Sequence, residues 1–249
     1  MLNNMNKVIK GDCLEEMMDI EPKSVDMILC DLPYGTTKNK WDSIIPLNKM
    51  WEDYKRIIKD NGIIILTAQD KFTAKLMLSN EKLHRYNLVW NKVLTSGFLN
   101  AGFLNANRMP LRVHEDICIF YKKLPTYNPI KTLGKKNHSK GEMNTDINNN
   151  YGKYNKVDNV EKLGDMKHPK SIISFEKPHP SKSVHPTQKP VALFEYLIKT
   201  YTNEGDLVLD NCAGSGTTGI AARNLNRDYI LIEKEQKYID IIKQRLNVR

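Results

Sequence analysis

The segment at residues 31–35 (DLPYG) carries residue types that could hold a planar, amino-bearing base for chemistry. It follows the apolar stretch VDMILC, which is typical of a buried strand. Because Pro33 disfavours the helical region for Leu32, the peptide after Asp31 is expected to be extended, with its carbonyl pointing into a cleft. The carboxylate, that carbonyl and the ring of Tyr34 suit an amino group on an aromatic base. The same residues are equally typical of a strand followed by a simple proline turn.

A glycine-containing turn follows a second predicted strand far along the chain. Residues 206–210 (DLVLD) predict a short buried strand, and residues 211–216 (NCAGSG) predict a turn that opens a helix at Thr217. Glycines there let a ligand approach the backbone closely. Glu233 ends the next apolar strand (YILIE), where its carboxylate could accept hydrogen bonds from ribose hydroxyls. These features predict a nucleotide-like ligand.

The glycines of this turn also match the GxGxxG spacing of a dinucleotide-binding loop, at Gly214, Gly216 and Gly219. In dinucleotide folds the first glycine follows the strand almost immediately, whereas here three residues intervene after Asp210. A carboxylate at that place would repel a pyrophosphate but attract a ligand with an ammonium and a sulfonium. The loop therefore favours such a cationic ligand over a nicotinamide or flavin dinucleotide.

With both segments in hand, the chain resembles the DNA methyltransferases that methylate amino groups with S-adenosylmethionine. The DLPYG segment precedes the cofactor loop, as in the permuted, beta-type class of that family. Three further segments match the family in its order: GDCLE at 11–15, HEDICIFYK at 114–122 and HPTQKP at 185–190. The resemblance covers most of the chain. One departure is Leu32, which replaces the first proline of the usual DPPY and leaves the backbone carbonyl in place.

The resemblance implies how the target base would be held. Asp31 and the Leu32 carbonyl would accept the hydrogens of an adenine amino group and aim its nitrogen at the sulfonium methyl, while Tyr34 would stack on the flipped base. No metal is needed. The residues implied for catalysis are Asp31, Leu32, Pro33 and Tyr34.

The resemblance also implies a set of cofactor contacts. Asp210 and the glycine-rich backbone would hold the methionine moiety, Glu233 the ribose, and Asp12 the adenine amino group. Asp12 is alternatively a helix N-cap ahead of Leu14. His185, Thr187 and Lys189 would meet the carboxylate end of the cofactor. The full implied set is Asp12, Cys13, Asp31, His185, Thr187, Lys189, Asp210, Ala213, Gly214, Ser215, Gly216, Thr217 and Glu233.

The target of methylation has competing interpretations. The family's cytosine-N4 enzymes more often carry Ser or Thr where this chain has Asp31, which favours adenine-N6 methylation. Relatives that act on RNA or on a protein glutamine amide typically have Asn there and lack a large basic insert. A catalytically silent DNA-binding relative is a further alternative, against which the intact Asp31, Tyr34 and Asp210 argue.

The charge of the chain favours a polyanionic partner. The chain has 249 residues, 40% of them hydrophobic, and a formal charge of +9. Residues 122–190 hold fourteen lysines and six acidic residues, so nearly all of the excess lies there. We expect double-stranded DNA as the partner, with a solvated lysine-rich loop as the alternative explanation. A homodimer and a cognate restriction enzyme stay open, and the small size leans toward a solitary, phage-borne enzyme.

Alternating strand and helix patterns predict an α/β fold with a doubly wound, mostly parallel, Rossmann-like sheet. Its ligands are expected at the carboxyl ends of the strands. We predict a catalytic half at 1–121, a target-recognition insertion at 122–184 and a cofactor-binding half at 185–249. Strands are expected at 25–30, 63–67, 88–90, 117–121, 207–210 and 229–233, and helices at 47–59, 71–79, 191–200, 217–224 and 236–246.

Two segments break this alternation. Residues 92–113 hold a tandem GFLNA repeat and are expected to form a loop that orders on DNA and helps to hold the base. Residues 132–183 are rich in Asn, Lys and Gly and are expected to recognise the target.

The remaining sequence features suggest an intracellular protein. The four cysteines are dispersed with no CxxC pair, so we expect neither disulfides nor a zinc site. The amino terminus lacks an apolar signal core and no stretch reaches the length of a membrane span. The expected location is the cytoplasm of a bacterial or phage-infected cell, close to the nucleoid.

Overall fold

The structure is a computed structural model that describes residues 6–36, 42–93, 110–135, 165–177 and 188–247. The chain divides into two compact units, one formed by residues 1–128 and 171–249 and the other by residues 129–170. The smaller unit contains a two-stranded antiparallel ribbon, in which β6 (Thr132–Leu133) pairs with β7 (Met166–Lys167). It falls inside the predicted insertion at 122–184, and the boundaries proposed for that insertion stay a prediction.

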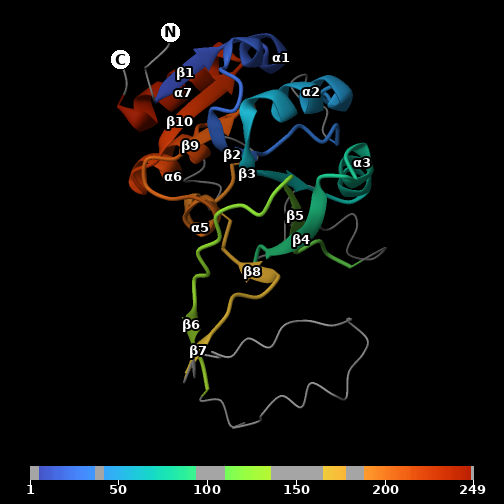
Figure 1. Cartoon of the computed structure of the whole chain (residues 1–249), viewed down its shortest axis with the longest axis vertical. Coiled ribbons are helices and arrows are strands. Elements are labelled where there is room, and N and C mark those ends of the chain that lie inside the picture. Colours follow the sequence, from blue (N-terminus) through green and yellow to red (C-terminus); the bar gives the residue numbers. More distant parts are fainter. Residues whose placement is uncertain (1–5, 37–41, 94–109, 136–164, 178–187, 248–249) are drawn as a thin grey trace. The chain divides into compact units, whose positions relative to one another are not determined.

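The larger unit is built on one eight-stranded sheet with the order β1-β10-β9-β2-β3-β5-β4-β8 (Figure 1). Every neighbouring pair is parallel except the two that involve β5, which runs antiparallel to both β3 and β4. The predicted mixed α/β fold with a mostly parallel sheet is therefore confirmed. The strands are β1 (Lys7–Lys10), β2 (Val25–Cys30), β3 (Ile58–Ala68), β4 (His84–Asn91), β5 (His114–Phe120), β8 (Ile172–Ser174), β9 (Leu207–Asp210) and β10 (Asp228–Glu233).

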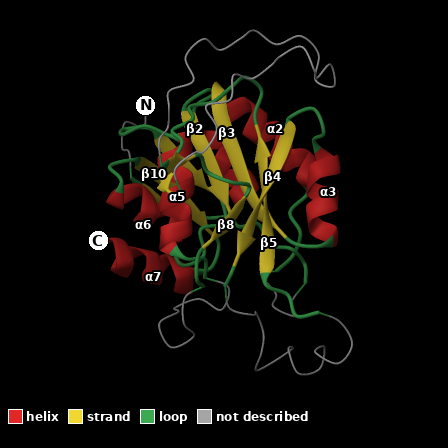
Figure 2. Ribbon diagram, turned by 90° about the horizontal axis from the view of Figure 1, so that it is seen from below, coloured by secondary structure: helices red, strands yellow, loops and turns green. Residues whose placement is uncertain are grey.

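Helices cover both faces of this sheet (Figure 2). On one face α5, α6 and α7 pack against a cluster that contains Met27 and Leu29 of β2. On the other face α2 and α3 pack against a cluster that contains Ile28 and Cys30. The two-residue period of a strand thus divides the core into two layers, as a doubly wound sheet requires. The helices are α1 (Cys13–Glu16), the short 3-10 helix η1 (Met17–Asp19), α2 (Leu47–Ile57), α3 (Lys71–Ser79), α5 (Val191–Tyr201), α6 (Thr217–Asn224) and α7 (Gln236–Leu246).

Most sequence-predicted elements recur with small differences at their ends. Helices α3, α6 and α7 and strands β2 and β9 have the predicted bounds. Strand β3 begins five residues before the predicted strand, because a register shift between β2 and β3 accommodates the polar stretch ahead of Ile63. The short elements β1, η1, β6, β7 and β8 were not predicted, and α1 was anticipated only through the alternative role of Asp12 as a helix N-cap.

Among the described residues, no helix combines the length and apolarity that crossing a membrane requires.

Candidate functional site

The carboxyl edge of the parallel strands gathers the acidic residues singled out in the sequence. Asp31 directly follows β2, Asp210 ends β9 and Glu233 ends β10. In the pairing of β2 with β3, Cys30 lies opposite Leu66, so Asp31 comes beside Thr67. The expected convergence of these carboxylates on one edge is therefore present in the fold.

Three different groups lie within hydrogen-bond distance of Asp31. Its Oδ1 atom accepts a hydrogen bond from the Thr67 hydroxyl and lies 2.9 Å from the Tyr34 hydroxyl. Its Oδ2 atom lies 2.7 Å from the ammonium of Lys189. The Asp31 side chain nevertheless keeps 23% of its surface exposed. This partial exposure leaves the Asp31 carboxylate within reach of an incoming donor.

Two lysines and one glutamate extend this arrangement into the protein. Lys189 also lies 3.2 Å from Glu115 Oε2, and Lys92 lies 2.5 Å from Glu115 Oε1. All three side chains are less than 10% exposed. Burial by itself opposes the charge of Lys189, but the carboxylates of Asp31 and Glu115 outweigh burial and raise its pKa. Two acidic and two basic side chains therefore form a charge-balanced network in which all but Asp31 are buried.

Tyr34 belongs to the same cluster through both its hydroxyl and its ring. The hydroxyl donates to Thr67 Oγ1 at 2.8 Å, and burial raises its pKa well above the usual value. The ring stacks on Phe72 of α3, with centroids 5.2 Å apart. The Lys189 ammonium lies 5.6 Å from the ring centre, within the range of a cation–π contact. The predicted stacking of Tyr34 on a base stays a prediction, since in this structure its aromatic neighbour is Phe72.

Leu32 and Asp42 anchor the segment on either side of Tyr34. The Leu32 side chain is buried, at 3% exposure, and packs with the α2 and α3 face of the core. Beyond the turn, Asp42 accepts hydrogen bonds from the backbone N–H groups of Gly35 and Thr36 at 2.8 and 2.9 Å. The proposed role of the Leu32 carbonyl as an acceptor for the target base stays a prediction.

The glycine-rich loop after β9 is organised by the carboxylate that precedes it. Asp210 Oδ1 accepts from the Cys212 N–H at 3.1 Å, and Oδ2 accepts from the Thr218 hydroxyl of α6. Burial raises the pKa of Asp210 to about 6. Gly216 is the N-cap of α6 with φ of 79°, a left-handed conformation that favours glycine. A β-carbon at that position would also lie only 3.0 Å from the Ile242 side chain.

Glu233 connects this loop to the neighbouring strand. Its Oε2 atom accepts from the Gly214 N–H and its Oε1 atom from the Glu235 N–H, both at 2.8 Å. Burial raises the pKa of Glu233. On the far side of β10, Asp12 caps α1 by accepting from the Leu14 N–H at 3.0 Å, and its other oxygen lies 3.2 Å from the exposed Lys234 ammonium. The N-cap interpretation of Asp12 is thus observed, and its contact with an adenine stays a prediction.

Three thiols, those of Cys13, Cys30 and Cys212, interact with one another. Cys13 and Cys212 share a hydrogen bond, which is the main reason that the pKa of the Cys13 thiol is raised. Burial raises the pKa of Cys30 to about 12. All four cysteines of the chain are free thiols. These thiols are therefore uncharged at physiological pH.

The negative charge of Asp210 and Glu233 suits a cationic nucleoside as the ligand. Asp210 and Glu233 accept hydrogen bonds from N–H and O–H groups that carry no formal charge. Their negative charges are therefore not neutralised by those contacts, and each oxygen keeps acceptor capacity. An ammonium, a sulfonium and ribose hydroxyls are the groups that such carboxylates would bind, and the backbone N–H groups of Cys212 and Gly214 lie against them.

Several sequence-predicted residues fall outside this picture. His185, Thr187 and most of the loop at 92–113, including its GFLNA repeat, lie outside the described residues. Lys189, which the resemblance assigned to the cofactor carboxylate, lies against Asp31 and Glu115; that assignment stays a prediction. Thr67, Lys92 and Glu115 were not singled out in the sequence, although an acidic residue heading the apolar strand EDICIF was a usable signal for Glu115.

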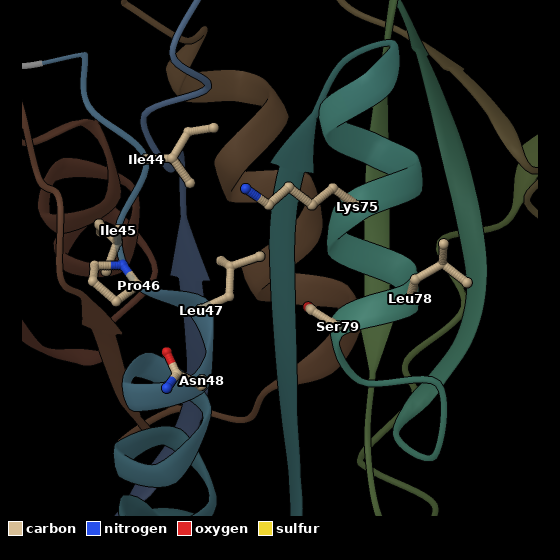
Figure 3. Close-up of a pocket in the computed structure, with 8 residues that line it drawn as sticks. All are labelled: Ile44, Ile45, Pro46, Leu47, Asn48, Lys75, Leu78 and Ser79. Atoms are coloured by element: carbon tan, nitrogen blue, oxygen red, sulfur yellow. The ribbon is translucent and has the colours of Figure 1, made fainter.

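A separate groove lies between α3 and the segment ahead of α2 (Figure 3). Its lining is mainly aliphatic, and it includes none of the acidic residues of the carboxyl edge. The lining residues are Ile44, Ile45, Pro46, Leu47, Asn48, Lys75, Leu78 and Ser79.

Comparison with known proteins identifies the same architecture elsewhere. Residues 25–244 match a family model described as DNA methylase. The chain is 28% identical to the Type II methyltransferase M2.MboI of Moraxella bovis, over 96% of this chain and 86% of that protein. It is 29% identical to the Type II methyltransferase M.HinfI of Haemophilus influenzae, over 97% of this chain and 68% of that protein.

Two solved structures have the same fold. The crystal structure of the M1.HpyAVI–SAM complex has a TM-score of 0.65 and 25% identity, covering 98% of this chain and all of that one. The PvuII DNA methyltransferase, named as cytosine-N4-specific, has a TM-score of 0.67 at 15% identity, covering 97% of this chain and 86% of that one. The latter likeness is one of fold alone.

Proposed function

The chain belongs to the N6/N4 DNA methylases, which use S-adenosylmethionine, and we propose that it methylates the N6 amino group of adenine in double-stranded DNA. The observation that carries this proposal is the position of Asp31. Its carboxylate directly follows β2 and is partly exposed. Strand β2 pairs with β9, the strand that leads into the glycine-rich loop. A substrate amino group that reaches Asp31 is therefore on the same sheet edge as the methyl donor's site.

Asp31 can make a weak nucleophile reactive by accepting one of its hydrogens. The lone pair of an adenine amino nitrogen is delocalised into the ring, so the free amine reacts poorly. A hydrogen bond to the Asp31 carboxylate shifts electron density back to the nitrogen and orients it. When the nitrogen gains a methyl group it must lose one proton, and we assign the acceptance of that proton to the Asp31 carboxylate. The contact uses Oδ2, whose partner in the structure is Lys189.

The glycine-rich loop after β9 and the carboxylates of Asp210 and Glu233 would bind the methyl donor. S-adenosylmethionine, when bound, contributes an electrophilic methyl group on a positively charged sulfur. We assign its methionine end to Asp210 and to the loop from Ala213 to Thr217, and its ribose to Glu233. The uncompensated carboxylates of this edge support that assignment, since they attract the two positive charges of the cofactor.

The choice of adenine over cytosine depends on the residue at the first position of the turn. Asp31 is a charged acceptor, whereas the family's cytosine-N4 enzymes more often have Ser or Thr at that position. The high lysine content of residues 122–190 supports duplex DNA as the substrate, because lysines neutralise phosphates. Such an enzyme would act in the cytoplasm, where bacterial DNA is accessible.

Expression of the chain in a host that lacks DNA methylation tests this proposal. Nucleoside mass spectrometry of the host DNA should show N6-methyladenine and no N4-methylcytosine above background, and an Asp31→Ala strain is the matched control. N4-methylcytosine as the main product would replace adenine by cytosine in the proposal. Absence of both bases, with soluble and cofactor-binding protein present, would move the substrate to RNA or protein.

A further inference from the structure

Glu115 is a buried acidic residue that the proposed reaction leaves unexplained. It is the second residue of β5, the antiparallel strand beside β3, and its side chain is 9% exposed. Its two oxygens each meet an ammonium, with Lys92 2.5 Å from Oε1 and Lys189 3.2 Å from Oε2. Removing a carboxylate from water is unfavourable, so the burial of Glu115 at this position needs a structural or functional explanation.

Charge balance alone does not supply that reason. Lys189 already has a carboxylate partner in Asp31, at 2.7 Å from Oδ2. Asp31 and Lys189 would form a neutral pair without Glu115 or Lys92. Glu115 and Lys92 are therefore a second pair of opposite charges beside a pair that is already neutral.

The presence of Glu115 changes how strongly Asp31 holds Lys189. The Lys189 ammonium lies between two carboxylates, 2.7 Å from one and 3.2 Å from the other. In a buried, low-dielectric environment an isolated ion pair is difficult to separate. An ammonium that touches a second carboxylate can move toward it without losing its charge partner.

We propose that Glu115 is a positioning residue that receives the Lys189 ammonium when Asp31 Oδ2 accepts the target amino group. This inference rests on the proposed function and deepens it. In the exchange, the Lys189–Asp31 hydrogen bond is replaced by an amino–Asp31 hydrogen bond, and the Lys189–Glu115 contact shortens. No proton or electron is transferred between the protein groups in this step.

The electrostatics of the network agree with an exchange between charged groups. Burial opposes ionisation of Glu115, but the ammoniums of Lys189 and Lys92 outweigh it and lower the pKa of the carboxyl. Burial lowers the pKa of Lys92, and Glu115 counteracts that effect. Lys92 thus helps to keep Glu115 ionised and ready to hold Lys189.

The simpler alternative is that Glu115 only neutralises two buried lysines. A charge-balanced double variant, Glu115→Gln with Lys92→Met, separates the two explanations. It removes one negative and one positive charge and leaves Asp31 and Lys189 as an isolated neutral pair. Under the alternative this variant regains the wild-type rate, whereas under the proposal it stays slow, because Lys189 has no second carboxylate to move to.

The measurement is the single-turnover rate of methyl transfer to genomic DNA from a methylation-free bacterium, with the enzyme in excess. We expect the double variant to be slower by roughly 10- to 100-fold, the factor that one charge-assisted hydrogen bond carries. Its dissociation constant for S-adenosylmethionine should stay within about threefold of wild type. Glu115→Asp, which keeps a carboxylate, should be faster than Glu115→Gln. The matched control is Asp26→Asn with Lys59→Met, which removes a salt bridge of 2.6 Å and should leave the rate unchanged.

A double variant that transfers methyl groups at the wild-type rate would overturn the inference. So would a slow double variant whose cofactor affinity has fallen in proportion. If the wild-type protein transfers no methyl group to this DNA, the proposed function itself fails. If the wild-type protein is active and the double variant is equally fast, only the inference about Glu115 fails.

Discussion

The two halves of the carboxyl edge handle negative charge in opposite ways. On the catalytic side, Asp31 and Glu115 lie against the ammoniums of Lys189 and Lys92. On the cofactor side, Asp210 and Glu233 accept hydrogen bonds from backbone N–H and hydroxyl groups. Both pairs are carboxylates at the ends of strands or next to them, yet only the first is neutralised inside the protein.

This difference corresponds to the charges of the two expected ligands. The amino group of a base is neutral, and a catalytic carboxylate that is balanced by lysines can meet it without a large net charge in the pocket. S-adenosylmethionine carries an ammonium and a sulfonium, which the unbalanced carboxylates of the other side would compensate. The carboxylates without a basic partner, Asp210 and Glu233, thus lie where a cationic cofactor would neutralise them.

The largest expected effect that would test this division is on the catalytic side. Asp31→Ala should reduce single-turnover methyl transfer by about 10³-fold or more, because it removes the acceptor that activates the amino nitrogen. The measurement is transfer of a labelled methyl group to methylation-free DNA. A variant with full turnover would remove Asp31 from the mechanism.

The next effect concerns the pH dependence of cofactor binding. Burial raises the pKa of Asp210 to about 6, so this carboxyl gains a proton and loses its charge as the pH falls through 6. Affinity for S-adenosylmethionine should therefore decrease about tenfold between pH 7 and pH 5, as expected for the loss of one attractive charge. Titration calorimetry at several pH values measures this.

Asp210→Asn is the control for that pH profile. The amide cannot ionise, so the variant should bind weakly at every pH and lose most of the slope below pH 7. An unchanged slope in the variant would assign the titration to another group of the site.

A smaller effect is expected in the lysine-rich unit at residues 129–170. Reversing charge at Lys135 and Lys170 should weaken DNA binding to all sequences alike and flatten its salt dependence by about one unit of slope for each lost phosphate contact. Cofactor binding should not change. The sequence suggests the same test for Lys136 and Lys140, which lie outside the described residues. If the slope is unaltered, these lysines form a solvated surface.

The smallest effect should come from Thr67. Its hydroxyl donates to Asp31 Oδ1, and Thr67→Val keeps the branched shape while it removes that donor. In this variant the Tyr34 hydroxyl can donate its one proton to Asp31 Oδ1 instead of to Thr67, and Lys189 still contacts Oδ2. Transfer should therefore slow by only about 3- to 10-fold, the share of one hydrogen bond. Tyr34→Phe is the matched variant on the same oxygen. A loss as large as that of Asp31→Ala would mean that Thr67 has a more direct part in catalysis.

Sequence patterns predicted the parts of the molecule that depend on local signals. Helix α7 was predictable because its apolar residues recur with a helical period. Strand β2 was predictable because it is a short apolar run that ends before Asp31 and Pro33, and helix α6 because a glycine-containing turn precedes it. The acidic residues Asp31, Asp210 and Glu233 were predictable because each closes an apolar strand. Strands β1 and β8 have only four and three residues, too few for a period to be recognised.

The charge network was not predictable, since it depends on pairing between distant segments. The antiparallel pairing of β5 with β3 places Asp116 opposite Ala68, and so brings the neighbouring Glu115 close to the turn after β2. Lys189 reaches Asp31 across 158 positions of the chain. Its assignment to the cofactor carboxylate came from resemblance alone, which conveys residue types but not which side chains are in contact.

Cofactor affinity measured side by side for Asp31→Asn and Glu233→Gln tests the division of charge most directly. Both variants remove one negative charge from the same sheet edge and keep the shape of the side chain. We predict that Asp31→Asn binds S-adenosylmethionine within about threefold of wild type, whereas Glu233→Gln binds it about tenfold or more weakly, as expected for losing an uncompensated charged acceptor. The reverse order, with Asp31→Asn weaker and Glu233→Gln unchanged, would contradict the account.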